Sequence, residues 1–375
     1  MEPSLVDTPY RLEAVLGTGT STKVFSATDT RTGKGVAVKW AETPHSAQLL
    51  KKEAAVMRDL KRCKAVPRLL AFSPNHQYIV MKRVGKTLFK LRETLGSFSL
   101  QTICLVGTRC ISALEEVHTC GYVHRDIKPD NITASLSPSS ARLYLIDFGL
   151  SSKYISKGVH VKYSETEKFQ GAPYFCTLNS LKGVKSTRRD DMEAVGFMLL
   201  YLKKGNLPWM QEPNVSRIEK ARERVSLEQL CAGEHPVFSE YLQYCQGLRF
   251  EEKPSYDYLR NLLQQTARRL DIDLASALPD WSPSKSSLVR SHSRRHRSRH
   301  RQTVTLSHTP VHCSLPGKAV SCLQLTCLLP CKSIGLMSTN DESGSEAVTY
   351  RATVKELPCV PWPRKGAFSS LLKSA

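Results

Sequence analysis

Two short segments constrain this chain more than any other feature of its sequence: residues 124–131 (HRDIKPDN) and 145–149 (LIDFG). Acidic residues in loops are usually solvated and carry no particular chemistry. Here both segments are complete, both lie beside apolar, strand-like residues, and only a short stretch separates them. Two such motifs together are not expected by chance, so we interpret them as parts of one site.

Phosphoryl transfer explains the residue types in these segments. Asp126 can accept the proton of an acceptor hydroxyl, while Asn131 and Asp147 can hold the Mg²⁺ ions that neutralise the phosphates of ATP. Lys128 adds positive charge next to the transferred group and favours a Ser or Thr acceptor over Tyr. The sequence therefore predicts catalytic roles for these four residues, with Asn131 and Asp147 as the metal ligands.

A lysine and a glutamate are predicted to complete this catalytic set. Residues 36–40 alternate as a strand does, so Lys39 shares one face with Ala37. Residues 45–62 have the apolar period of a helix, and Glu53 lies on its apolar stripe. Because a carboxylate that faces the core is costly unless paired, we expect Lys39 to pair with Glu53 and to hold the α- and β-phosphates. Taken alone, a surface lysine and a half-exposed glutamate are an equally good interpretation.

A turn rich in glycine and threonine lies between two strand-like segments, 10–16 and 24–28. Because these glycines stand between two strands, and not between a strand and a helix, a dinucleotide-binding turn is disfavoured. Such a loop can cover nucleotide phosphates with its backbone N–H groups, although glycines in a hairpin usually serve only backbone geometry. The residues expected to contact the phosphates are Gly17, Thr18, Gly19 and Thr20.

The order of the patterns predicts an α+β, bilobal domain followed by a tail. Short strands and one helix come first, a second helix is expected over residues 99–120, and the pattern after Gly171 is mostly helical. The predicted parts are an N-terminal extension (1–9), a domain (10–275) with a small β-sheet lobe (10–84) and a larger helical lobe (85–275), and a basic, largely disordered tail (276–375).

The chain has 54 Lys and Arg against 34 Asp and Glu, a formal net charge of +20. Both the domain and the tail are basic, which favours acidic or phosphorylated protein partners, although a merely solvated basic surface is the alternative. Residues 290–301 carry six arginines and three histidines. This run is too polar to offset its ordering entropy, and it could bind RNA or an import receptor, or be a phosphorylation target.

No stretch of the sequence is long and apolar enough to cross a bilayer, and the first residues lack the pattern of a secretory signal. We therefore expect an intracellular monomer, in the cytoplasm or the nucleus, without membrane contact. Most of the cysteines in the domain lie in apolar surroundings and are expected to be free. A zinc site in the tail is disfavoured because the spacing is loose; its candidate ligands are His312, Cys313, Cys322, Cys327 and Cys331.

With these motifs, residues 10–270 resemble a eukaryotic protein kinase. Within that superfamily the chain most resembles the casein kinase 1 group, which includes the tau-tubulin and vaccinia-related kinases. The stretches that carry this resemblance are TLN at 177–179, where that group has Ser-Ile-Asn in place of the usual Ala-Pro-Glu, STRRDD at 186–191, LPW at 207–209, YLQYC at 241–245 and LRFEEKPSY at 248–256.

The resemblance implies a protein kinase that transfers the γ-phosphoryl group of ATP, with Mg²⁺, to Ser or Thr of acidic protein substrates. It also implies that Asp191 orders the catalytic loop and that the basic tail can dock back and inhibit. The residues that it places around the nucleotide base are Leu16, Val24, Ala37 and Ile146, with Met81 as gatekeeper and Val84 in the hinge (82–84).

Three positions depart from the family pattern. Thr22 replaces the third glycine of the phosphate loop, and Lys82 stands where an acidic residue is usual in the hinge. Tyr174 stands where casein kinases 1 have an arginine that reads a phosphate on the substrate, and tyrosine cannot supply that charge. These departures motivate one alternative, a pseudokinase scaffold that binds ATP without turnover, although no essential Lys or Asp is missing.

The stretch around Tyr174 stays basic, so acidic substrates remain compatible with it. Arg188 and Arg189 fit two roles equally well, contact with a substrate or structural pairing with acidic neighbours such as Asp190. The basic residues of this stretch are Lys153, Lys157, Lys162, Lys168, Lys182, Lys185, Arg188 and Arg189.

Overall fold

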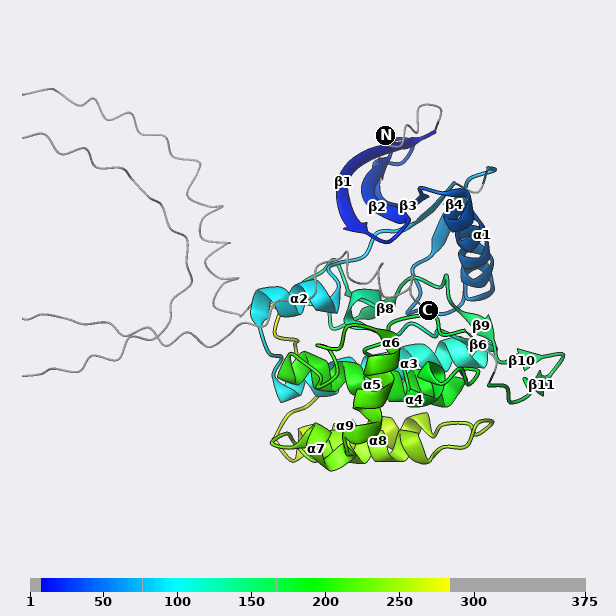
Figure 1. Cartoon of the computed structure of the whole chain (residues 1–375). Coiled ribbons are helices and arrows are strands. Elements are labelled where there is room, and N and C mark those ends of the chain that lie inside the picture. Colours follow the sequence, from blue (N-terminus) through cyan, green and yellow to red (C-terminus); the bar gives the residue numbers. More distant parts are fainter. Residues whose placement is uncertain (1–7, 76, 166–167, 284–375) are drawn as a thin grey trace, which may run out of the picture. The chain divides into compact units, whose positions relative to one another are not determined.

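The computed structural model describes residues 8–75, 77–165 and 168–283, and Figure 1 shows them as a small lobe built on a sheet and a larger helical lobe. The α+β, bilobal prediction is confirmed. The Arg-rich run and the candidate zinc ligands of the tail lie outside the described residues.

The small lobe contains a five-stranded antiparallel sheet in the order β1-β2-β3-β5-β4. One face of this sheet covers a core that includes Tyr10, Val36 and Val38. Because side chains alternate along β3, Ala37 and Lys39 lie on the other face, toward the site described below. The strands are β1 (Tyr10–Thr18), β2 (Thr22–Asp29), β3 (Lys34–Ala41), β4 (Leu69–Phe72) and β5 (Tyr78–Lys82).

The helix of the small lobe, α1 (Pro44–Asp59), begins at a capping box. The Thr43 side chain accepts a hydrogen bond from the Ser46 N–H, and the Ser46 hydroxyl accepts one from the Thr43 N–H. These bonds satisfy two of the backbone donors that every helix start leaves free. The helix ends three residues before the predicted residue 62. Its buried face contains Leu50, Glu53, Ala54 and Met57.

The large lobe is built around α3 (Leu100–Thr119) and α5 (Arg188–Lys204), which pack against each other. Two glycines allow close helix packing: a Cβ on Gly107 of α3 would lie 2.6 Å from Leu263 of α9, and one on Gly196 of α5 would lie 2.5 Å from Leu242 of α8. Among the described residues, no helix could span a membrane. The other helices are α2 (Leu88–Leu95), α4 (Leu178–Leu181), α6 (Val215–Arg224), α7 (Leu227–Cys231), α8 (Val237–Gly247) and α9 (Tyr256–Arg268).

Short elements between α3 and α4 carry most of the polar motif residues. Strand β6 pairs with β9, β7 with β8, and β10 with β11, each pair antiparallel. These elements are β6 (Tyr122–Val123), the 3₁₀ turn η1 (Pro129–Asn131), β7 (Ile132–Ala134), β8 (Leu143–Leu145), β9 (Ser152–Lys153), β10 (Ile155–Ser156) and β11 (Val159–His160).

The first residues of the predicted tail pack on the large lobe. The Asp280 carboxylate accepts hydrogen bonds from the Ser99 N–H and hydroxyl, both at 2.7 Å, and so caps the start of α3. The Asp280 N–H donates in turn to the Thr102 hydroxyl at 2.9 Å, and Trp281 lies against Phe98 with ring centroids 5.7 Å apart. Asp280 and Trp281, which the sequence assigns to the tail, thus contact the large lobe.

A buried carboxyl on α5 gives the large lobe a dependence on pH. Burial raises the pKa of Glu193 from 4.5 to about 7, although the nearby Arg222 acts to lower it. Between pH 4.5 and 7 the unfolded chain therefore ionises at this position while the folded chain does not. The stability that the neutral carboxyl contributes is present below pH 4.5 and is lost as the pH rises to 7, a decrease of about 3 kcal/mol in the free energy of unfolding.

Replacement Glu193→Gln is expected to remove this loss, since glutamine is neutral and its oxygen can still accept the hydrogen bond from Gln246. Compared with the wild type, the variant should unfold at a higher temperature at pH 8, and the difference should shrink as the pH is lowered to 5. Calorimetric melting temperatures at four pH values measure this. A difference that is independent of pH would contradict the prediction.

Candidate active site

The two lobes meet in a network of charged side chains centred on Lys39. Its Nζ lies 2.7 Å from Glu53 Oε2 and 2.8 Å from Asp147 Oδ1. The Lys39 and Glu53 side chains are only 8% and 2% exposed, so the alternative of a surface lysine with a half-exposed glutamate is wrong. Burial acts to lower the pKa of Lys39, but the two carboxylates outweigh it and raise that pKa. The lysine therefore stays charged at neutral pH.

Asp126 lies at the centre of a second cluster, after β6. Lys128 Nζ lies 2.7 Å from Asp126 Oδ2, and the Asn131 amide donates to the same oxygen at 2.7 Å and to the Asp126 carbonyl at 2.8 Å. The 3₁₀ turn η1 places the asparagine so that it can reach back over the loop. Asp126 Oδ1 is buried and has no hydrogen-bond partner among the described residues. It is an acceptor that is free to take a proton.

The β7–β8 pair brings the two motifs together. Ile132 lies opposite Leu145 in this pair, and the Ile146 N–H donates to the Asn131 carbonyl at 2.9 Å. Asn131 and Asp147 therefore lie at the same end of the two strands. This arrangement joins the Asp126 cluster to the Lys39 network through backbone hydrogen bonds.

Asn131 and Asp147 form a donor set that suits Mg²⁺. The Asn131 amide nitrogen is used by Asp126, which leaves its carbonyl oxygen for a cation, and the Asp147 side chain is 44% exposed. Burial acts to raise the pKa of Asp147, but Lys39 outweighs it and holds that pKa below its ordinary value. Within the described ranges, no group of three or more His, Cys, Asp or Glu side chains could hold a metal. Mg²⁺ commonly binds only one or two protein ligands when phosphate oxygens and waters complete its coordination.

The residues predicted around the nucleotide share one face of the sheet. Val24 lies directly opposite Lys39, and Ala37 directly opposite Met81, in the register of the strands. Residues opposite each other or two apart point the same way, so these four side chains line the face that also carries the Lys39 network. The remaining predicted positions are Leu16, Gly17 and Thr18 in β1, Gly19 and Thr20 in the turn after it, Val84 after β5 and Ile146 after β8.

The turn between β1 and β2 is held closed by Thr22. The Gly19 N–H donates to the Thr22 carbonyl at 2.7 Å, and a Cβ on Gly19 would lie 2.8 Å from the Thr22 hydroxyl. A side chain at Gly19 would therefore have to displace this threonine. Thr22 is the first residue of β2. The position at which the family pattern has the third glycine of the phosphate loop therefore lies in a strand. At the base of the turn, the Lys90 side chain on α2 donates to the Leu16 carbonyl at 2.5 Å.

An aspartate on α5 holds the loop that contains Asp126. This residue is Asp191, and its carboxylate accepts hydrogen bonds from the N–H groups of His124 at 2.7 Å and of Arg125 at 2.9 Å. The buried His118 side chain lies 2.9 Å from the same carboxylate and 2.8 Å from the Tyr256 hydroxyl. Arg125 has a φ of 71°, a left-handed conformation that is strained for a residue with a side chain. The sequence contains no local signal for His118, which the fold brings in from α3.

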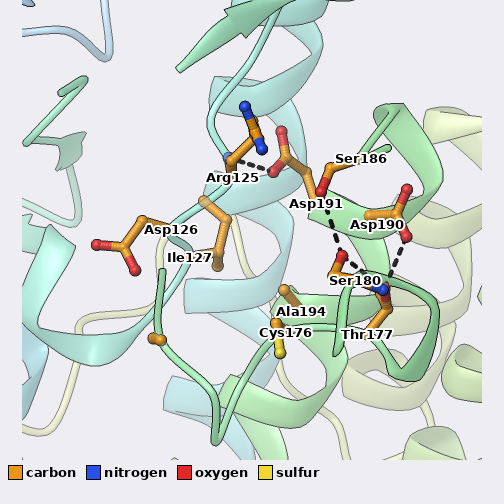
Figure 2. Close-up of a pocket in the computed structure, with 11 residues that line it drawn as sticks. Arg125, Asp126, Ile127, Cys176, Thr177, Ser180, Ser186, Asp190, Asp191 and Ala194 are labelled. Carbon is orange, nitrogen blue, oxygen red and sulfur yellow. Dashed lines mark hydrogen bonds between the residues drawn. The ribbon is translucent and has the colours of Figure 1, made fainter. Parts of the chain in front are cut away.

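A pocket lies beside Asp126, between the catalytic loop and the segment that precedes α5 (Figure 2). The Thr177 hydroxyl donates to Asp190 Oδ1 at 2.7 Å and so fastens the start of α4 to the start of α5. The Arg222 guanidinium donates to the Cys176 carbonyl and lies over the rings of Phe197 and Trp209. The lining residues are Arg125, Asp126, Ile127, Ala172, Cys176, Thr177, Ser180, Ser186, Asp190, Asp191 and Ala194.

Arg188 and Arg189 are structural residues in this arrangement. Arg188 donates to the Glu251 carbonyl at 2.7 Å and lies over the Tyr154 ring, while Arg189 donates to the Leu248 carbonyl at 2.9 Å. The sequence suggested pairing with acidic neighbours as the structural role, whereas the contacts observed are mainly to backbone carbonyls and a ring, with Arg189 Nε 3.9 Å from Asp190 Oδ2. Both side chains tie the start of α5 to the loop before α9.

A comparison with models of known protein families agrees with this geometry. The model described as the protein kinase domain matches residues 10–273 of the chain. The match covers every residue of the site described above and both lobes of the fold.

Proposed function

This chain belongs to the protein kinase family, and from that premise we propose that it is an active protein Ser/Thr kinase of the casein kinase 1 type. Protein kinases use ATP and Mg²⁺ to phosphorylate hydroxyl groups. The observation that carries the proposal is the joined network in which Lys39 contacts both Glu53 and Asp147. Activity requires the pairing of this lysine with the helix glutamate, and a chain that only binds nucleotide has no need to preserve it.

Each charged residue of the network has a separate task in the proposed reaction. Bound Mg²⁺ would neutralise charge on the β- and γ-phosphates, and Asn131 and Asp147 would hold it. Lys39 would hold the α- and β-phosphates. The free Oδ1 of Asp126 would accept the proton of the substrate hydroxyl. Lys128, 2.7 Å from the other oxygen of Asp126, would offset negative charge on the transferred group, which supports a Ser or Thr acceptor.

We propose that the substrates are acidic and need no prior phosphate. Tyr174 supports the second part, because the residue is only 2% exposed and its carbonyl accepts the Trp209 indole N–H at 2.8 Å. It therefore presents no cation to a substrate phosphate. Lys157 and Lys162 support the first part, since both are exposed. Ser164, two residues after Lys162, accepts a hydrogen bond from the Lys185 N–H at 2.8 Å, next to Ser186 in the lining of the pocket.

A peptide library tests these proposals together. A serine peptide flanked by Asp and Glu should be phosphorylated with a kcat/KM about tenfold above a neutral peptide, and the preference should weaken with added salt. A phosphoserine upstream should give no more gain than a glutamate. The double variant Lys157→Ala/Lys162→Ala should lose much of the preference, while Lys61→Ala, which removes an exposed lysine next to α1, should not. Thermal stabilisation by ATP without any labelled peptide would favour the pseudokinase alternative instead.

A further inference from the structure

Two cysteines outside the active site lie in contact across the junction between the lobes. Cys63 Sγ and Cys120 Sγ are 3.7 Å apart, although 57 residues separate them in the chain. Cys63 follows the end of α1 and is buried, whereas Cys120 caps the end of α3 and is exposed. Neither residue takes part in the network around Lys39 or Asp126.

Other contacts hold the same two segments together. The Tyr122 hydroxyl donates to Asp59 Oδ2 at 2.5 Å, and the Lys64 N–H donates to Glu116 Oε2 at 2.6 Å. Asp59 and Lys64 flank Cys63 in the sequence, and Glu116 and Tyr122 flank Cys120. The two hydrogen bonds therefore hold the segments on both sides of the cysteines, and the fold keeps the two sulfur atoms facing each other. Their proximity does not depend on a free loop that could carry one of them away.

The two thiols differ in what they can do. Burial, together with Cys120 and Glu116, raises the pKa of Cys63 to about 12, so that Cys63 remains a thiol at neutral pH. Cys120 is the member that solvent can reach, and a dissolved oxidant would meet it first. An accessible thiol with a resolving thiol beside it is the arrangement that forms a reversible disulfide.

We propose that Cys63 and Cys120 form a reversible disulfide when the protein meets a peroxide. The Cys120 thiolate attacks one peroxide oxygen, the O–O bond breaks, and the leaving oxygen departs as water or an alcohol after taking up a proton. Cys120 is thereby oxidised to the sulfenic acid. The Cys63 sulfur then attacks the Cys120 sulfur, the S–O bond breaks, and the hydroxyl group leaves as water with the Cys63 proton. A thiol reductant reverses the bond.

The disulfide would join two elements that hold catalytic residues. Cys63 closely follows α1, which carries Glu53. Cys120 is followed by β6, which leads into the loop that contains Asp126. The bond would fix the end of α1 against the end of α3 and restrict its movement away from Lys39. The inference does not rest on the proposed kinase activity, since bond formation can be measured without it.

The experiment treats the full chain with hydrogen peroxide and maps its peptides without reduction. We expect one linked peptide containing Cys63 and Cys120, and its loss after thiol reduction. Oxidation should raise the melting temperature of the wild type by roughly 5 °C, because the crosslink closes a long loop in the unfolded chain. Hydrogen exchange at the last turn of α1 should slow in the same sample.

Variants separate this bond from other oxidation chemistry. In Cys63→Ala, a 1,3-dicarbonyl probe for sulfenic acids should label Cys120 persistently, whereas in the wild type the labelling should fade as the disulfide forms. Cys120→Ser should show neither the labelling nor the rise in melting temperature. Cys231→Ala, which removes a buried cysteine elsewhere, should behave as the wild type. A disulfide from Cys120 to any other cysteine, or sulfenic acid that persists in the wild type, would overturn the proposal.

Discussion

Replacing Asp147 with asparagine is expected to lower the rate of phosphoryl transfer about a thousandfold while the chain stays folded. The amide has the shape of the carboxylate but lacks its charge, so it holds a divalent cation weakly and no longer forms an ion pair with Lys39. The Asp147 side chain is 44% exposed and lies at the edge of the network, where a neutral isostere can be accommodated. The loss should therefore fall on kcat and on the Mg²⁺ requirement.

Steady-state kinetics on an acidic serine peptide, with ATP held constant and Mg²⁺ varied, measures this effect. Asp257→Asn is a matched control, since Asp257 is exposed on α9 and pairs with Arg260 three residues on. It should retain the turnover of the wild type. Equal incorporation of phosphate by the wild type and Asp147→Asn would end the proposal of an active kinase, and unchanged melting temperatures would show that the loss is chemical.

The parts of this site that could be predicted are those for which a few neighbouring residues decide the outcome. The alternation along β3 gives Lys39 its face, and the period of α1 gives Glu53 its buried position. A buried carboxylate needs a partner, so the Lys39–Glu53 pair followed from two local patterns and one energetic rule. The placement of Ala37 and Met81 near the nucleotide was expected from the family resemblance alone, and the register that sets them directly opposite each other is known only from the structure.

The parts that could not be predicted depend on contacts between distant segments. Nothing near His118 in the sequence indicates that it meets Asp191 and Tyr256, since each residue is helical and only the packing of α3, α5 and α9 joins them. The Ser- and Pro-rich composition around Asp280 predicts a tail, yet the Asp280 carboxylate caps α3 by accepting hydrogen bonds from Ser99. Caps of this kind satisfy free N–H groups, and any nearby carboxylate can supply them.

A change of one atom in the buried Asp191 carboxylate is expected to lower both stability and activity. In Asp191→Asn, one oxygen becomes an NH₂ group and faces donors, because the carboxylate accepts from the N–H groups of His124 and Arg125 and from the ring of His118. Donor facing donor inside the protein should cost about 3 kcal/mol, and the melting temperature should fall by roughly 8 °C. The Arg125 N–H would then lose the hydrogen bond to Asp191 that holds this residue in its strained backbone conformation.

The pH dependence of this variant distinguishes the proposed cause from a general loss of packing. Burial acts to raise the pKa of Asp191, but the His118 hydrogen bond and the charges around it outweigh burial, so the folded pKa lies below its ordinary value. Stability from this carboxylate is therefore present above about pH 4 and is lost as the pH falls through the folded pKa. Melting temperatures measured from pH 7 down to pH 3 should converge for the wild type and Asp191→Asn. A constant gap would mean that the charge of Asp191 is not what holds the Arg125 backbone. Kinetics below the melting transition should then show whether Asp126, which follows Arg125 in the chain, remains in place, since a misplaced proton acceptor lowers kcat far more than it raises KM.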